Sequence, residues 1–185
     1  MKFVVLTALS LALGACSMHR TTLEVYGDVP SFVLTAQDGR PFHSQELAGK
    51  IWVADFMYTT CPGPCPRMTS QMHDVQQAVL KVPDVHLVSF TVDPKNDTPA
   101  VLADYAKVHG ASPAMWTFLT GPVATLQMLD RDAFKLGNVD GSLQHSTRFV
   151  LVDRQGRIRA YYETSDPSSI PKLISDIRDL ARDRT

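Results

Sequence analysis

Two segments of the chain, residues 51–57 and 85–92, are rich in apolar and β-branched side chains and do not alternate between apolar and polar positions. A strand with one face in water alternates, so these segments are typical of strands buried on both faces of a sheet. Residues 64–81, after the first segment, carry apolar side chains at helical spacing, and residues 98–109, after the second, also have the features of a helix. Buried strands that alternate with helices predict an α/β domain.

The remainder of the chain continues this order and then closes with paired strands. The further expected elements are strands at 31–35 and 115–119, helices at 122–136 and 168–182, and two strands at 147–153 and 157–163. The last two strands form a hairpin around Gly156, which makes the sheet mixed. This order is that of the thioredoxin fold with an N-terminal extension and an inserted strand–helix unit. We therefore expect a thioredoxin-like fold, with a central mixed sheet, helices on both faces, and a C-terminal β-hairpin plus helix.

Composition excludes several classes of protein. Among 185 residues, 44% are hydrophobic and 20% charged, which is typical of a soluble globular domain rather than of a disordered or multi-span membrane protein. Eighteen basic and nineteen acidic residues give a net charge of −1, so no positive excess is available to bind a nucleic-acid backbone. Three cysteines are too few for a disulfide scaffold, so each one needs its own explanation.

The first sixteen residues resemble an export signal. One positive charge at Lys2 precedes an apolar run at residues 3–15, which is shorter than the roughly 20 residues of a transmembrane helix. The run ends in Leu-Gly-Ala before Cys16, which resembles the lipobox of bacterial lipoproteins. This resemblance implies a lipoprotein signal peptide at residues 1–15 and a diacylglyceryl thioether on Cys16. The alternative is an ordinary signal peptide that leaves a free thiol nearby.

An export signal at the N-terminus also predicts the domain boundaries and the cellular location of the protein. Residues 16–27 become a lipidated N-terminus and polar tether, and residues 28–185 form one thioredoxin-like domain. We expect the protein to be attached to a membrane by its lipid and to face the periplasm or the outer side of the cytoplasmic membrane, where thiols meet oxidising conditions. Nothing in the sequence indicates an obligate dimer, so we expect a monomer.

The second and third cysteines come directly after the first buried strand. Three prolines lie between or beside Cys61 and Cys65, and a helix interior does not tolerate them. The helix must therefore begin at about residues 64–66, with both sulfurs near its N-terminus, where free amides and the helix dipole lower a thiol pKa. A separation of four residues places the two Cα atoms about 6 Å apart in helical geometry. That distance suits either a disulfide or shared ligation of one metal.

The sequence offers few partners for such a metal. A structural zinc site needs four ligands, and the domain has no further cysteine. Two thiolates with one imidazole instead form a soft site of low coordination number, which suits copper and especially Cu(I). His145 lies in the loop before residues 147–153, and in a thioredoxin-like sheet this loop lies beside the cysteine loop. The other histidines are expected to be surface or capping residues, namely His19, His43, His73, His86 and His109.

Three segments carry a family resemblance: residues 56–66 with both cysteines, residues 89–99, and His145 ahead of residues 149–153. Together, in this order and spacing, they resemble the Sco/SenC proteins, copper chaperones of cytochrome c oxidase assembly. The resemblance covers about residues 28–180 and implies a thioredoxin-like fold.

The resemblance also implies ligands and a task. Carried over to this sequence, Cys61, Cys65 and His145 are implied as ligands of Cu(I) or Cu(II), with Cys61 and Cys65 as a redox disulfide. The implied task is delivery of copper, or of reducing equivalents, to the binuclear copper site of cytochrome c oxidase subunit II, or to another exported copper protein. Many relatives have an aspartate directly before the ligand histidine. Gln144 stands there in this chain, which weakens an electrostatic preference for Cu(II).

Residues around these motifs have more than one interpretation. Asp93 either steers a cation or orders His145, or it only forms a turn before the next helix. Asp97 is interpreted as a cap of that helix, for which Thr98 is the other candidate. Met57, Met68 and Met72 surround the cysteine motif, and methionine sulfur also binds Cu(I), but the helical spacing of Met68 and Met72 favours packing in the core. Packing is also expected for Tyr58 and Trp116.

Two functions remain open from the sequence. One is a copper chaperone, which is not an enzyme in the sense of turnover and which needs the reduced cysteine pair because the metal ligand is a thiolate. The other is an exported thiol–disulfide oxidoreductase that acts on partner cysteines through a mixed disulfide. The three residues between the cysteines, where thioredoxins have two, and the presence of His145 favour metal binding.

Overall fold

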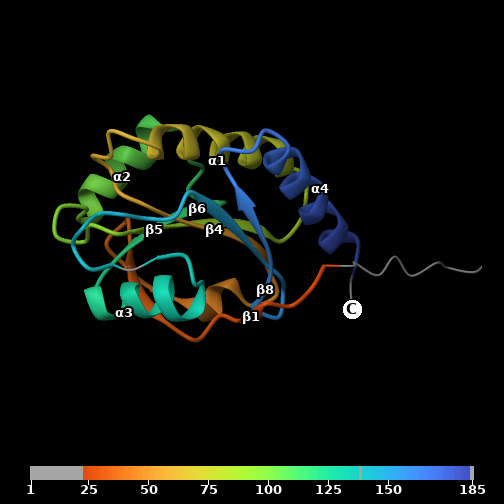
Figure 1. Ribbon diagram of the computed structural model, residues 1–185, viewed down its shortest axis with the longest axis horizontal. Coiled ribbons are helices and arrows are strands. Elements are labelled where there is room, and N and C mark those ends of the chain that lie inside the picture. The colour runs from red at the N-terminus through yellow and green to blue at the C-terminus, as the bar shows by residue number, and fades with distance from the viewer. Residues whose placement is uncertain (1–22, 138, 184–185) are drawn as a thin grey trace, which may run out of the picture.

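The computed structural model describes residues 23–137 and 139–183, and an eight-stranded mixed sheet forms its centre (Figure 1). The strand order is β1-β8-β7-β4-β5-β6-β2-β3. β4, β5 and β6 are parallel to one another, and all other neighbouring pairs are antiparallel. The strands are β1 (Gly27–Asp28), β2 (Val33–Ala36), β3 (Pro41–His43), β4 (Ile51–Met57), β5 (Val85–Thr91), β6 (Trp116–Thr120), β7 (Arg148–Val152) and β8 (Arg157–Glu163).

Helices cover both faces of the sheet. α1, α2 and α4 lie over one face and α3 over the other (Figure 1). Along β4, Val53 packs in the apolar core on the α1 face, and its neighbours Trp52 and Ala54 pack in the core on the α3 face. The predicted thioredoxin-like fold, with its terminal hairpin and helix, is confirmed. The helices are α1 (Cys65–Val79), α2 (Pro99–Val108), α3 (Val123–Gln127), α4 (Ser169–Arg182), the 3₁₀ helix η1 (Ser44–Leu47) and the π-helix η2 (Met128–Ala133).

The structure differs from the expectation in three short elements and one helix. β1, β3 and η1 were not expected, because segments of two to four residues carry no recognisable periodicity. Residues 122–136, expected as one helix, form α3 followed by the wider turn of η2. Lys135 ends this turn in a left-handed conformation with φ of 53°, and the amide of Leu136 donates to the carbonyl of Asp130. Asp130 therefore lies in a π-helical turn, where its side chain is fully buried.

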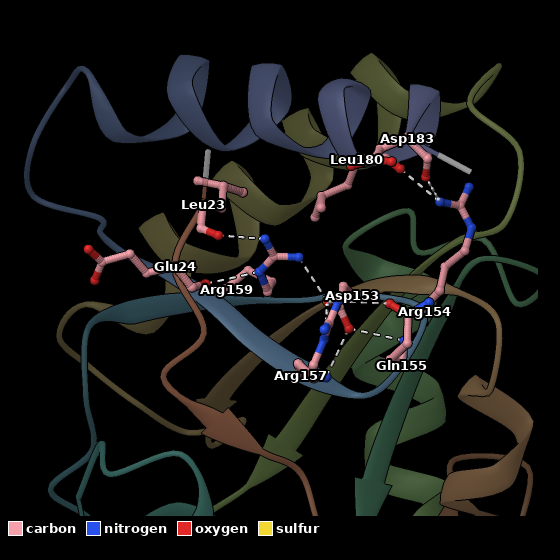
Figure 2. A network of polar contacts seen from close by, with 9 residues as sticks. All are labelled: Leu23, Glu24, Asp153, Arg154, Gln155, Arg157, Arg159, Leu180 and Asp183. Carbon is pink, nitrogen blue, oxygen red and sulfur yellow. Dashed lines mark hydrogen bonds and ion pairs between the residues drawn. The ribbon is translucent and has the colours of Figure 1, made fainter. Parts of the chain in front are cut away.

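A polar network ties both ends of the described chain to the turn between β7 and β8, as Figure 2 shows. Arg159 forms an ion pair of 2.9 Å with the buried Asp153 and donates hydrogen bonds to the backbone carbonyls of residues 23 and 24. Arg154 donates to two carbonyl groups at the end of α4. Because Val152 pairs with Trp52, this network lies at the start of β4, at the opposite end of the sheet from the loop that follows β4.

Residues 23–27, which the sequence assigned to the tether, pack on the domain. The amide of Tyr26 donates to the carbonyl of Ile158, and the ring of Tyr26 packs edge-on against that of Tyr161 at 5.5 Å. The signal peptide predicted at residues 1–15 and the lipidation predicted at Cys16 lie outside the described residues. In the part of the chain that the structure describes, no helix combines the length and apolar character needed to cross a membrane.

Candidate metal centre

The loop after β4 presents two cysteines at the start of α1. Cys65 is the first residue of α1 and Pro64 its N-cap, so the predicted helix start is confirmed. Cys61 lies four residues earlier, where its amide donates to the carbonyl of Tyr58. Both thiols are free, and the exposed fraction is 8% for Cys61 and 1% for Cys65. Both sulfurs are thus shielded, with Cys61 closer to solvent.

His145 reaches the cysteines from the loop before β7. Because β7 runs antiparallel beside β4, residues that precede β7 meet residues that follow β4. The His145 Nε2 atom lies 3.0 Å from the Cys65 sulfur and 3.9 Å from the Cys61 sulfur. The three donor atoms all lie within 4.8 Å of one another. The structure therefore brings together the three residues that the sequence indicated.

The environment of His145 fixes which ring nitrogen is free for a metal. Its Nδ1 atom lies 2.9 Å from the carbonyl oxygen of Ser146, which can only accept, so Nδ1 carries the proton and donates. In the neutral ring the lone pair is then on Nε2, which points at the two sulfurs. The ring of Tyr58 packs edge-on against the imidazole at 5.7 Å and limits its rotation. This is the arrangement that holds a histidine ready to bind a metal.

The two thiols differ in acidity. Burial opposes ionisation of Cys61, but its contacts with His145 and Cys65 and hydrogen bonds from nearby backbone amides outweigh it and lower the pKa of Cys61 to about 6. Burial raises the pKa of Cys65 far above its usual range, and the negative charges of Cys61 and Asp55 raise it further. One thiolate is therefore present at neutral pH, and the second forms when a cation replaces its proton.

The donor set fits a single soft cation. Two ligands bonded to one metal at about 2.3 Å lie roughly 4 Å apart, close to the spacing of these three atoms. Thiolate sulfur selects Cu(I), and imidazole binds both copper oxidation states. Among residues 23–137 and 139–183, no fourth cysteine, histidine or carboxylate joins the cluster, so those residues do not form a closed four-ligand zinc site.

Asp97 holds the cysteine loop in place rather than capping α2. Its carboxylate is fully buried and accepts hydrogen bonds of 2.5 Å from the hydroxyls of both Thr59 and Thr91, with a longer one from the Thr59 amide at 3.2 Å. Thr98 is the N-cap of α2. The interpretation of Asp97 as a helix cap was therefore wrong. The residue connects the loop of Cys61 to the end of β5.

Asp93 lies in the turn that follows β5. Its carboxylate accepts a hydrogen bond of 2.7 Å from the Asn96 side chain, and its carbonyl accepts from the amides of Asn96 and Asp97. Its negative charge makes a minor contribution to the raised pKa of Tyr58, which stems mainly from burial of the phenol. These contacts place Asp93 in a turn near Tyr58, and none of them joins it to His145.

The remaining expectations had mixed outcomes. Met57, Met68 and Met72 are at most 1% exposed, so their assignment to the core is confirmed. His86 was expected to be a surface or capping residue, but it is 7% exposed within β5, and its Nε2 atom lies 2.9 Å from the Thr117 hydroxyl. Burial lowers the pKa of His86 to about 4, so this histidine is neutral.

Sequence reasoning missed two buried carboxylates, Asp55 and Asp130. Asp55 is the one charged residue within β4, and that contrast was the available signal. Asp130 follows Leu126 by four residues and lies next to Leu129, so regular helical spacing places it on the apolar face of the predicted helix, and that position was its signal. Burial raises the pKa of each to about 6, and a positive charge at His145 would partly oppose the rise.

Comparisons with known proteins agree with this geometry. A model of the SCO1/SenC family matches residues 22–182. The chain belongs to the SCO1/SenC family. A SCO1 protein homolog from Bacillus subtilis is 33% identical over 91% of this chain and 90% of its own length. A putative copper-binding protein from Stutzerimonas stutzeri is 29% identical over 85% of this chain and 84% of its own.

A solved structure shows the same fold. The crystal structure of a SCO1/SenC family lipoprotein from Bacillus anthracis superimposes with a TM-score of 0.77 at 34% identity. The match covers 84% of this chain and 95% of that one. The Sco domain of this chain thus spans nearly the whole of a known family member.

Proposed function

We propose that this protein is an exported, lipid-anchored copper chaperone that delivers copper to the binuclear copper site of cytochrome c oxidase subunit II. The chain is a copper-binding member of the SCO1/SenC family. The observation that carries the proposal is the convergence of Cys61, Cys65 and His145, with Nε2 of His145 directed at both sulfurs. Support for the recipient comes from the description of the Sco family as cytochrome c oxidase assembly proteins.

Copper loading requires the reduced cysteine pair. A disulfide sulfur carries no negative charge and is a poor ligand, whereas two thiolates and an imidazole neutralise and hold a copper ion. On loading, Cys65 loses the proton that burial otherwise retains. Oxidation of the copper-free pair to a disulfide would pass two electrons to an external oxidant and release the one proton held by Cys65, and it would abolish the site. The redox state of the thiols therefore controls whether copper is held.

The exposure of the ligands suggests an order of release. Cys61 is the more exposed sulfur and lies with His145 towards solvent, whereas Cys65 is enclosed. An incoming ligand of the recipient would therefore replace Cys61 or His145 first, and Cys65 would leave last. Stepwise exchange avoids a free copper ion at any stage.

The location of the protein follows from its N-terminus. Lipidation at Cys16 would attach the domain to a membrane on its periplasmic or outer side, and one relative of known structure is a lipoprotein. The first described residues lie at the end of the sheet opposite to the metal centre. The site would thus be presented away from the point of attachment.

The proposal is tested by titrating reduced protein with one equivalent of Cu(II). We expect a sulfur-to-copper charge-transfer absorption that His145→Ala alters and that a combined Cys61→Ser and Cys65→Ser substitution abolishes. His43→Ala, which removes an exposed histidine in β3, is the matched control and should leave the band unchanged. A band that persists in the double serine variant would refute the assigned ligands.

A second function keeps support from one observation. The pKa of Cys61 is lowered to about 6 while that of buried Cys65 is raised, which is the asymmetry of an attacking and a resolving thiol. As a thiol–disulfide oxidoreductase the protein would reduce a partner disulfide, and its own cysteines would become oxidised. Copper-free reduction of a disulfide substrate by the wild-type protein, lost in Cys61→Ser, would favour this function over copper delivery.

A further inference from the structure

Two buried carboxylates lie near the metal centre but outside its ligands. The first is Asp55, 1% exposed, in the middle of β4 on the face that α1 covers. The hydroxyl of Ser89 donates to it at 2.6 Å, and the indole of Trp116 donates to Ser89 at 2.9 Å. This chain of hydrogen bonds fixes the carboxylate in the core that also contains Cys65.

The second carboxylate, Asp130, approaches from the opposite face of the sheet. It lies in η2 with no exposed surface, and neither carboxylate oxygen has a hydrogen-bond partner among the described residues. Gly137 passes directly over it, since a Cβ atom there would lie 3.1 Å from the Asp130 Oδ2 atom. Gly137 belongs to the segment that leads from η2 to His145, so the carboxylate lies beneath the start of the ligand loop.

Neither carboxylate is neutralised by a nearby cation. The ion pairs of the described residues include no partner for Asp55 or Asp130. A positive charge at His145 would lower the pKa of both, so both lie within electrostatic reach of the metal centre. Each pKa is about 6, so both groups are mostly ionised at pH 7.5. A buried and unpaired charge is unfavourable, and positive charge at the metal centre offsets it.

We infer that Asp55 and Asp130 set the oxidation-state preference of the copper site by favouring Cu(II) over Cu(I). Both oxidation states share the same three ligands, and the soft thiolates among them favour Cu(I). The two carboxylates interact with the metal at longer range, and the ion with the additional positive charge gains more from them. Gln144, beside the ligand histidine, carries no charge, so these buried acids supply what the loop itself lacks. The inference rests on the proposed copper site.

The test compares full-length wild-type protein with Asp55→Asn and Asp130→Asn. The dissociation constants for Cu(II) and for Cu(I) are measured at pH 7.5 by competition with a chelator specific for each state. The Cu(II) preference is expressed as the ratio of the two dissociation constants, and we expect each substitution to lower it by about tenfold. This is the effect of one unit charge roughly 10 Å from the metal at an effective dielectric constant of about 20. The reduction potential of bound copper should rise correspondingly.

Asp132→Asn is the matched control, because Asp132 lies in the same π-helix but is exposed and paired with Arg131. It should change the ratio less than twofold. Asp130→Asn decides the matter even if Asp55→Asn does not fold, because Asp130 has no side-chain hydrogen bond to lose. An unchanged ratio in Asp130→Asn, or an equal change in the control, would overturn the inference.

The same samples separate this inference from the proposed function. If wild-type protein shows the charge-transfer band and Asp130→Asn leaves the ratio unchanged, only the role of the carboxylates is refuted. If the band does not depend on the cysteines, the copper site itself is refuted, and the inference is refuted with it.

Discussion

Replacement of Asp97 by alanine should loosen the cysteine loop and destabilise the fold. The substitution removes two hydroxyl hydrogen bonds of 2.5 Å that join Thr59 to Thr91 through a fully buried carboxylate. Each hydrogen bond to a charged acceptor contributes about 1.5 kcal/mol at the lower end of measured values, which gives roughly 3 kcal/mol for the two. The longer bond from the Thr59 amide is left out of this sum, because removal of a buried charge offsets a comparable amount.

The assay is urea unfolding, combined with the rate at which iodoacetamide alkylates Cys61. We expect a loss of about 3 kcal/mol in the free energy of unfolding for Asp97→Ala and about half of that for Asp97→Asn, which keeps one acceptor oxygen. Alkylation should become several-fold faster in Asp97→Ala, because the loop opens. Asp104→Asn, on the exposed face of α2, is the control and should change neither quantity. A loss below about 1 kcal/mol with unchanged alkylation would refute the role of Asp97.

Three further predictions concern titratable groups. Asp130→Asn should stabilise the copper-free protein by about 1–3 kcal/mol at pH 8 in urea unfolding. Burial raises the folded-state pKa of Asp130 to about 6, so above that pH the charged carboxylate disfavours folding. The stabilisation by Asp130→Asn should therefore shrink as the pH falls from 6 towards 4. A stabilisation that does not change with pH would contradict the reasoning. Asp153→Ala removes the ion-pair partner of Arg159, which is 8% exposed, and should lower the free energy of unfolding at pH 7 by about 3–5 kcal/mol in the same assay. A loss under about 1 kcal/mol would mean that the network of Figure 2 contributes little to stability. Alkylation of Cys61 should be half-maximal near pH 6 and move towards the ordinary thiol range in His145→Ala, and an unchanged profile would exclude His145 as a cause of the low pKa.

Much of the fold and the ligand set was predictable because the signals are local or follow from topology. β4 and β5 are continuous buried strands, and their composition identifies them without knowledge of the rest of the chain. The prolines around Cys61 and Cys65 define the start of α1. His145 is 80 residues from Cys65, but the antiparallel pairing of β7 with β4 brings the two together.

The features that the sequence did not reveal depend on contacts between distant segments. Asp97 has the local pattern of a helix cap, yet its partner Thr59 lies 38 residues away, and only the folded structure shows which contact wins. Asp130 lies in the π-helical turn η2, where Gly137 passes over it, and the sequence predicted a regular helix there. His86 is enclosed because Thr117, 31 residues away, lies beside it.

The most direct test of the copper site is X-ray absorption spectroscopy of copper-loaded, reduced protein. Convergence of Cys61, Cys65 and His145 predicts two sulfur ligands at about 2.3 Å and one nitrogen ligand at about 2.0 Å. His145→Ala should remove the nitrogen contribution and keep both sulfurs. A spectrum with fewer than two sulfur ligands, or one that His145→Ala leaves unchanged, would contradict the three-ligand site.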